Sequence, residues 1–190
     1  GEVVRRFSEA TNHNAVLVTD VGQNQMVGVR YFQYTQTRSV VTSGGLGTMG
    51  FGLPAAIGAK LGAPDRTVCL FVGDGGLQMT IQELGTIMQE RLDVKIILLN
   101  NHFLGMVRQW QELFFNERYS ATEMENPDFV AIARAFRIAS REVSRREELD
   151  EAVEEMMATD GPYLLVADVE KCGIIYPMVP AGASISNILM

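Results

Sequence analysis

The chain has 190 residues, of which 47% are hydrophobic and 21% charged, and its formal net charge is −7. This size fits one domain with a core of its own, and the balance is that of an ordinary globular protein. An acidic chain without a basic cluster argues against nucleic acid or an anionic membrane as a partner, and no apolar run is long enough to span a membrane. Two cysteines, Cys69 and Cys172, give no disulfide framework, which favours a reducing, cytoplasmic location.

Short apolar runs alternate along the chain with segments of helical spacing. Strands are predicted at 15–19, 39–42, 67–72, 94–99 and 163–169. Helices are predicted at about 53–61, 77–88, from about 104, 127–136 and 145–158. Asn126 is expected to cap the helix that has Pro127 in its first turn. From about residue 171 the proline- and glycine-containing sequence predicts an irregular C-terminal tail.

This alternation predicts an α/β fold: a three-layer, doubly wound parallel sheet with helices on both faces. No repeat or linker divides the chain, so residues 1–190 are expected to form one domain. Ligands of such sheets bind at the carboxyl ends of the strands. The polar motifs Asp20-Val21-Gly22, Gly73-Asp74-Gly75 and Asn100-Asn101 all follow predicted strands, so we expect a site there.

The strongest pattern is Gly73-Asp74-Gly75 followed, after 24 intervening residues, by Asn100-Asn101. Asp74 and Asn101 offer hard oxygen ligands of the kind that Mg²⁺ prefers, and Mg²⁺ is commonly held by a few protein groups together with a phosphate. Gly75 and Gly76 allow close backbone approach, and free N–H groups of the helix expected from Leu77 favour a phosphate. Either half alone is typical of an ordinary turn. The combination predicts a metal-bridged diphosphate.

This combination resembles the fingerprint of thiamine-diphosphate (ThDP) enzymes, GDG followed later by NN. Further segments resemble the diphosphate loop, the pyrimidine loop and two stretches typical of acetolactate synthase. They are, in that order, residues 18–26 (VTDVGQNQM), 42–56 (TSGGLGTMGFGLPAA), 99–111 (LNNHFLGMVRQWQ) and 176–182 (YPMVPAG). Over about residues 2–182 the chain is similar to the C-terminal ThDP-binding domain of acetolactate synthase catalytic subunits.

The resemblance implies a role for each matching residue. Asp74, the Asn101 side chain and the Phe103 carbonyl are expected to bind Mg²⁺. The expected diphosphate contacts are Gly22, Gln23, Asn24, Gly75 and Gly76.

The other implied contacts concern the rings of ThDP and the substrate. The backbone at Gly47 and Met49 is expected to hold the aminopyrimidine, and the Met49 side chain to impose a V-shaped cofactor. Met106 and Val107 are expected on the thiazolium side, and Gly105 is a further expected cofactor contact. Trp110 is expected to favour a larger second keto acid such as 2-ketobutyrate.

Simpler interpretations exist for several of these residues. Met49 and Met106 are equally typical of core fillers, and Trp110 of an apolar helix face. The chain also departs from the family at three positions: Asn24 stands where many relatives have His, Gly76 where Ser is usual, and Val27 where a bulkier residue is frequent. An Asn can still donate a hydrogen bond at the first position, whereas the hydroxyl is lost at the second.

The resemblance also implies what this chain lacks. In the family an activating glutamate lies in a separate N-terminal pyrimidine domain, and FAD binds a middle domain. This chain is expected to start after both, to hold no catalytic residue and to be inactive alone. The implied parent is a transferase that decarboxylates pyruvate and joins the two-carbon unit to pyruvate or 2-ketobutyrate in branched-chain amino-acid biosynthesis. A homodimer or higher oligomer and a small regulatory subunit are expected.

Two alternatives stay open on the sequence. The first is another ThDP enzyme of this architecture: pyruvate oxidase, a keto-acid decarboxylase or glyoxylate carboligase. The second is a non-catalytic module that associates through an apolar face. Magnesium-dependent ThDP binding separates the second alternative from the others, and product analysis separates the enzymes.

Overall fold

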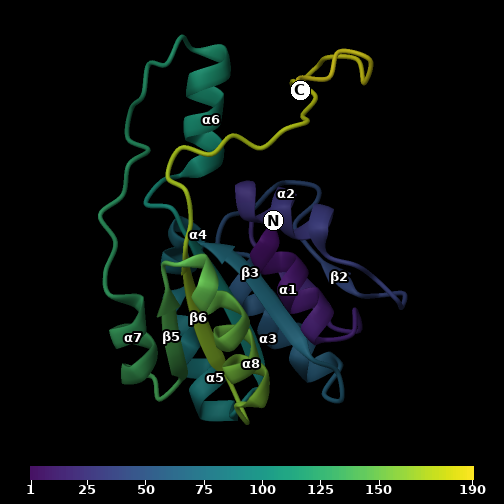
Figure 1. The fold of residues 1–190 in the computed structure, drawn as a ribbon, viewed down its shortest axis with the longest axis vertical. Helices are drawn as coiled ribbons and strands as arrows, with labels where there is room; N and C mark the ends of the chain where they lie inside the picture. The colour runs from purple at the N-terminus through teal and green to yellow at the C-terminus, as the bar shows by residue number, and fades with distance from the viewer.

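The computed structural model describes residues 1–190 and contains one six-stranded sheet between two layers of helices (Figure 1). The strands are β1 (Val16–Thr19), β2 (Val40–Val41), β3 (Val68–Gly73), β4 (Val94–Asn100), β5 (Ala139–Val143) and β6 (Tyr163–Asp168). Their order in the sheet is β2-β1-β3-β4-β6-β5, and all neighbours are parallel. The predicted three-layer, doubly wound α/β fold is therefore confirmed.

The helices divide between the two faces of the sheet. They are α1 (Glu2–Ala10), α2 (Gln23–Tyr31), α3 (Gly52–Gly62), α4 (Asp74–Met79), α5 (Leu84–Glu90), α6 (Gly105–Phe114), α7 (Phe129–Ala135) and α8 (Leu149–Ala158). In β3, Val68, Leu70 and Val72 pack in a core cluster with α3, α4, α5 and α7. Cys69 and Phe71 belong to the opposite cluster, with α1, α2 and α8. Because alternate strand residues face opposite layers, a strand covered on both sides reads as an unbroken apolar run.

The helix predicted at 77–88 differs from the structure at its start and in its middle. Helix α4 begins at Asp74, and the chain breaks at Thr80 before a 3₁₀ turn, Ile81–Glu83, leads into α5. The Thr80 hydroxyl donates to the Gly50 carbonyl at 3.1 Å, a contact that helical periodicity does not encode. A similar 3₁₀ turn, Arg146–Glu148, replaces the start of the helix predicted at 145–158.

The prediction that Asn126 caps a helix is wrong. Helix α7 begins at Phe129, and the carboxylate of Asp128 accepts the Ala131 N–H at 2.8 Å. Pro127 therefore lies before the helix and not in its first turn. The Asn126 side chain points instead toward the ends of β3 and β4, where it donates to Asp74 and Asn100.

Three elements were not predicted, namely α1, α2 and β5. Helix α2 lies where a loop was expected after Gly22, and its sequence mixes polar and apolar residues without a clear helical stripe. Strand β5 is an edge strand with only one buried residue, Val143, so it carries no apolar run. Its position follows from parallel pairing with β6, a tertiary contact.

The segment after residue 171 contains no helix or strand, as predicted, and holds one isolated bridge between Met178 and Leu189. In Figure 1 this yellow segment leaves the carboxyl end of β6 and passes across α6, which lies at that end of the sheet. None of the helices has both the length and the apolar character that crossing a membrane requires.

Candidate cofactor and metal site

The register of the sheet brings the polar motifs together. Gly73 at the end of β3 pairs with Leu99 of β4, so Asp74 lies beside Asn100 and Asn101. After β1 the chain continues to β2 on one side of the sheet, whereas after β3 it continues to β4 on the other side. The carboxyl ends of β1 and β3 thus flank a topological switch point, where ligands of doubly wound sheets bind.

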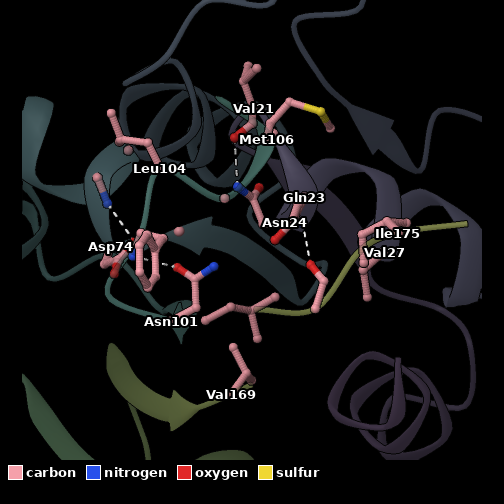
Figure 2. A pocket seen from close by; sticks show the side chains of 18 of the residues that line it. Val21, Gln23, Asn24, Val27, Asp74, Asn101, Leu104, Met106, Val169 and Ile175 are labelled. Carbon is pink, nitrogen blue, oxygen red and sulfur yellow. Dashed lines mark hydrogen bonds between the residues drawn. The ribbon is translucent and has the colours of Figure 1, made fainter. Parts of the chain in front are cut away.

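A cavity of about 570 Å³ lies across these strand ends. Its lining includes every predicted metal and cofactor residue: Gly22, Gln23, Asn24, Gly47, Met49, Asp74, Gly75, Gly76, Asn101, Phe103, Gly105, Met106 and Val107. Figure 2 shows Asp74 and Asn101 on one side of the cavity and Gln23 and Asn24 on another. Segments more than 80 residues apart in the sequence are thus gathered around one space.

Asp74 is the buried anion of this site, with 1% of its surface exposed. Its Oδ1 accepts the Gly75 N–H at 3.0 Å. Its Oδ2 accepts two hydrogen bonds, from the His102 N–H at 2.8 Å and from the Asn126 amide at 2.7 Å. A carboxylate has about four lone-pair positions. Three are filled by donors, so one position, on Oδ1, is free for a cation.

The neighbouring oxygen atoms fit a hard metal ion. The Asn101 Oδ1 accepts only the Phe103 N–H, at 3.1 Å. The backbone bonds that tie this loop to residues 122–124 are made by His102 and Leu104, which leaves the Phe103 carbonyl without a hydrogen bond in the protein. The structure contains no cluster of three or more His, Cys, Asp or Glu residues that could hold a metal ion. One carboxylate, one amide oxygen and one carbonyl fit Mg²⁺ supplemented by phosphate oxygens, and do not fit a zinc site.

The start of α2 offers free backbone donors on the other side of the cavity. The first intrahelical bond runs from the Met26 N–H to the Gly22 carbonyl, so the N–H groups of Gln23, Asn24 and Gln25 have no partner within the helix. The Asn24 amide donates to the Val21 carbonyl at 2.8 Å, and its buried Oδ1 has no partner. One of its two amide hydrogens is therefore still available, which is compatible with a contact to an anion.

The Gln23 side chain is held inside the protein. Its amide donates to Gln109 at 2.9 Å and to the Gly173 carbonyl at 2.8 Å, so its free contribution to an anion is its backbone N–H. A Cβ atom on Gly105 would lie 2.3 Å from Gln23 Oε1 and 2.8 Å from Asn101 Nδ2. Gly105 therefore permits the approach of both polar side chains.

Asp20 is a site residue to which the sequence analysis gave no role of its own. Its carboxylate is fully buried and accepts the N–H groups of Gly50 at 3.2 Å and Gly52 at 2.7 Å. It thereby holds the glycine-rich loop that contributes Gly47 and Met49 to the cavity. A Cβ atom on Gly76 would lie 2.4 Å from Asp20 Oδ1, so the carboxylate occupies the space that the usual serine would need.

Residues of the tail and of α6 complete the wall. Gln109 is fully buried, and its side chain exchanges two hydrogen bonds with the Ile175 backbone, at 3.0 and 3.3 Å. Gly173, Ile174 and Ile175 line the cavity. No sequence signal marked this contact, because it joins a polar helix residue to a segment without regular structure.

On the flank of the site, Asn100 donates to Asp168 at 2.9 Å. Partial burial, followed by the negative charge of Asp168, raises the pKa of Glu142 on the adjacent strand β5. The protonated form of Glu142 is therefore favoured in the folded protein relative to the unfolded chain.

The structure does not bring Trp110 into the main cavity. Trp110 lies 42% exposed on α6 and lines a neighbouring cavity of about 550 Å³, which shares Met106 and Val107 with the first. Its ring packs edge-on against Phe114, with centroids 6.2 Å apart. The core-filler interpretation is wrong for Trp110, Met49 and Met106, since none of them is buried.

The family described as "Thiamine pyrophosphate enzyme, C-terminal TPP binding domain" matches residues 20–167 of this chain. The chain belongs to this family of thiamine-pyrophosphate-binding domains, thiamine pyrophosphate being another name for ThDP.

Three curated relatives to which the chain is similar are all acetolactate synthase subunits. The chain is 45% identical to the acetolactate synthase isozyme 2 large subunit of Escherichia coli (strain K12), over 98% of this chain and 34% of that protein. It is 44% identical to the acetolactate synthase large subunit of Lactococcus lactis, over 95% and 32%. It is 40% identical to the mitochondrial acetolactate synthase catalytic subunit of Saccharomyces cerevisiae, over 98% and 28%. The chain thus spans about a third of the length of these relatives.

Proposed function

We propose that this chain binds ThDP together with Mg²⁺, as the cofactor-binding part of an acetolactate synthase. The observation that carries the proposal is the single cavity whose lining includes all the residues expected to contact the cofactor and metal. The free lone-pair position on Asp74 Oδ1 and the unpaired Phe103 carbonyl support a cation at one end.

The proposed roles follow from the chemistry of each group. Asp74, the Asn101 amide oxygen and the Phe103 carbonyl hold Mg²⁺, which neutralises part of the diphosphate charge. The backbone N–H groups of Gly22, Gln23, Asn24 and Gly76 donate to the diphosphate. Gly75, whose own N–H donates to Asp74 Oδ1, permits close approach of the diphosphate to the backbone.

The remaining contacts orient the two rings of the cofactor. Gly47 and Met49 hold the aminopyrimidine through backbone atoms, while the Met49 side chain separates the two rings. Gly105, Met106 and Val107 cover the thiazolium side and exclude water from it. When bound, ThDP supplies the carbanion chemistry, which protein side chains cannot supply themselves.

For the whole enzyme, we propose decarboxylation of pyruvate and transfer of the two-carbon unit to pyruvate or 2-ketobutyrate, in branched-chain amino-acid biosynthesis. The names of the relatives support this reaction over those of pyruvate oxidase, a keto-acid decarboxylase or glyoxylate carboligase. Trp110, at the rim beside Met106 and Val107, is the proposed determinant of acceptor size.

Several properties of the whole enzyme belong to the same proposal. They are FAD in a middle domain, an activating glutamate in an N-terminal domain, and a small regulatory subunit, which accords with relatives named large or catalytic subunits. A homodimer or higher oligomer is supported by exposed apolar side chains on and beside α6, including Val107 and Phe115. A cytoplasmic location is supported by two unpaired cysteines.

Calorimetric titration of ThDP into the purified chain tests the cofactor proposal. We expect binding with Mg²⁺, none with EDTA, and a loss of roughly 100-fold or more in affinity for Asp74→Ala, because the variant removes the only anionic ligand. Asp65→Ala, which removes an exposed carboxylate, is the control and is expected to bind like wild type. A folded wild-type chain that binds no ThDP, or binds it without Mg²⁺, contradicts the proposal.

An activity assay tests the proposed need for the other domains. With pyruvate, ThDP and Mg²⁺ we expect no acetolactate from this chain alone. Robust acetolactate formation would show that the chain holds the whole catalytic machinery.

A further inference from the structure

Asn126 is half-buried and makes three of the four hydrogen bonds open to an asparagine amide. Its nitrogen donates to Asp74 Oδ2 at 2.7 Å and to Asn100 Oδ1 at 2.8 Å, and its oxygen accepts from Gln78 Nε2 at 3.0 Å. The opposite amide orientation would place its oxygen against two oxygens and its nitrogen against a nitrogen. Only the observed orientation pairs donors with acceptors.

These bonds connect two elements that build the site, α4 and β4. Asp74 starts α4 at the end of β3, Asn100 ends β4, and Gln78 lies in α4. Asn126 itself comes from the segment between α6 and α7, which the Met124 N–H ties to the His102 carbonyl at 2.8 Å. A residue 52 positions from Asp74 in the sequence is thus held rigidly against its carboxylate.

The two oxygens of Asp74 are consequently not equivalent. Oδ2 receives the His102 N–H and the Asn126 amide, which fill both of its lone-pair positions. Oδ1 receives only the Gly75 N–H. Without Asn126, Oδ2 would regain a free position and the carboxylate could offer both oxygens to one ion.

We propose that Asn126 is a positioning residue for the metal ligand: it occupies Oδ2 of Asp74 so that Oδ1 alone faces the cation. This inference rests on the proposed binding of Mg²⁺ and ThDP. A single-oxygen ligand suits Mg²⁺, which demands near-octahedral geometry, whereas Ca²⁺ accepts bidentate carboxylates. Asn126 therefore favours Mg²⁺ over Ca²⁺ at this site.

The test is calorimetric titration of ThDP at a series of Mg²⁺ and, separately, Ca²⁺ concentrations, with wild type, Asn126→Ala and Asn126→Leu. Leucine keeps the branched shape of the side chain, with a somewhat larger volume, and removes the amide. We expect both variants to need roughly 10–100-fold more Mg²⁺ for half-maximal ThDP binding, the usual effect of removing a group that orients a metal ligand. The requirement for Ca²⁺ is expected to change less, so the preference shifts toward Ca²⁺.

Asp128→Ala is the matched control, because it removes the cap of α7 two residues away without touching Asp74. It is expected to lower the melting temperature but to keep the wild-type metal preference. The inference is overturned if either folded Asn126 variant keeps the wild-type Mg²⁺ requirement, or if Asp128→Ala shifts the metal preference equally. If the wild-type chain shows no Mg²⁺-dependent binding, the proposed function itself is overturned. If wild type binds and Asp74→Ala does not, but the Asn126 variants behave like wild type, only the role of Asn126 is overturned.

Discussion

The two ends of the cavity are built differently. At the end formed by β3 and β4, Asp74 is almost completely buried, and its carboxylate is held by three donors from three different residues. At the other end, Val107 leads into the neighbouring cavity, where Val107, Trp110 and Phe115 are 42–50% exposed. We call these two regions the buried end and the exposed end of the site.

The buried end is fixed by the core of this domain, because its residues follow directly from strands packed on both faces. The exposed end presents apolar side chains that nothing within this chain covers, which is typical of a surface that contacts other protein. Binding of the metal and diphosphate is therefore expected to depend on this chain, and handling of the substrate on a completed assembly. Four substitutions test that division, beginning with the largest effect.

Gly105→Ala is expected to damage the cofactor site most. Its Cβ atom would lie within 2.8 Å of both Gln23 and Asn101, so one or both side chains must move. We expect a loss of roughly 10–100-fold in affinity for ThDP with Mg²⁺, as for other groups that orient ligands. Calorimetry measures it.

The matched control for Gly105→Ala is Gly58→Ala, since a Cβ atom there meets nothing within 4 Å. This variant is expected to bind normally and to stabilise α3 by about 0.5–1 kcal/mol. Equal affinities for the two variants would show that the close approach at Gly105 is unimportant.

Asp20→Asn tests the support of the glycine-rich loop. The variant keeps one oxygen but places an amide nitrogen where the N–H of Gly50 or Gly52 now finds an acceptor. We expect a loss of about 1–2 kcal/mol in the free energy of unfolding, because a buried donor is left unpaired. Urea denaturation measures the change, and a stability equal to wild type would mean that the loop does not need the carboxylate.

Trp110→Ala tests the exposed end. Because this side chain is 42% exposed and lies outside the main cavity, we expect unfolding free energy to change by less than about 1 kcal/mol and ThDP affinity by less than about twofold. In the whole enzyme the same substitution is expected to reduce the preference for 2-ketobutyrate over pyruvate. Competition between the two acids measures that preference, and a large loss of ThDP binding in this chain would contradict the division between the two ends.

Glu142→Gln tests the charge on the flank of the buried end. The raised pKa means that stability associated with protonated Glu142 is complete below its unfolded pKa and is lost as pH rises through the folded one. The neutral variant is therefore expected to melt at a slightly higher temperature at pH 7 and at the wild-type temperature near pH 4. Because Glu142 is largely exposed, solvent screening keeps the effect below about 0.5 kcal/mol. A difference that grows on acidification would contradict the assignment.

The sequence by itself determined the architecture and most of the site. Buried parallel strands must be apolar on both faces, so β1, β3, β4 and β6 are visible as continuous runs, and the motifs that follow them must meet at one edge of the sheet. Asp74 and Asn101 could therefore be paired from their positions after two such runs, and the resemblance supplied the roles proposed for Gly47, Met49 and Met106.

Only the tertiary structure decided which oxygens and amides of the site meet. Asn126 has the sequence context of a helix cap, Gln109 that of a polar helix position, and Asp20 that of a strand end. Each acquires its role through partners that lie 26 to 86 residues away in the chain. Local spacing reports which face of an element is buried, but a buried polar group must find whatever partner the packed fold places beside it, and that pairing is a property of the assembled core.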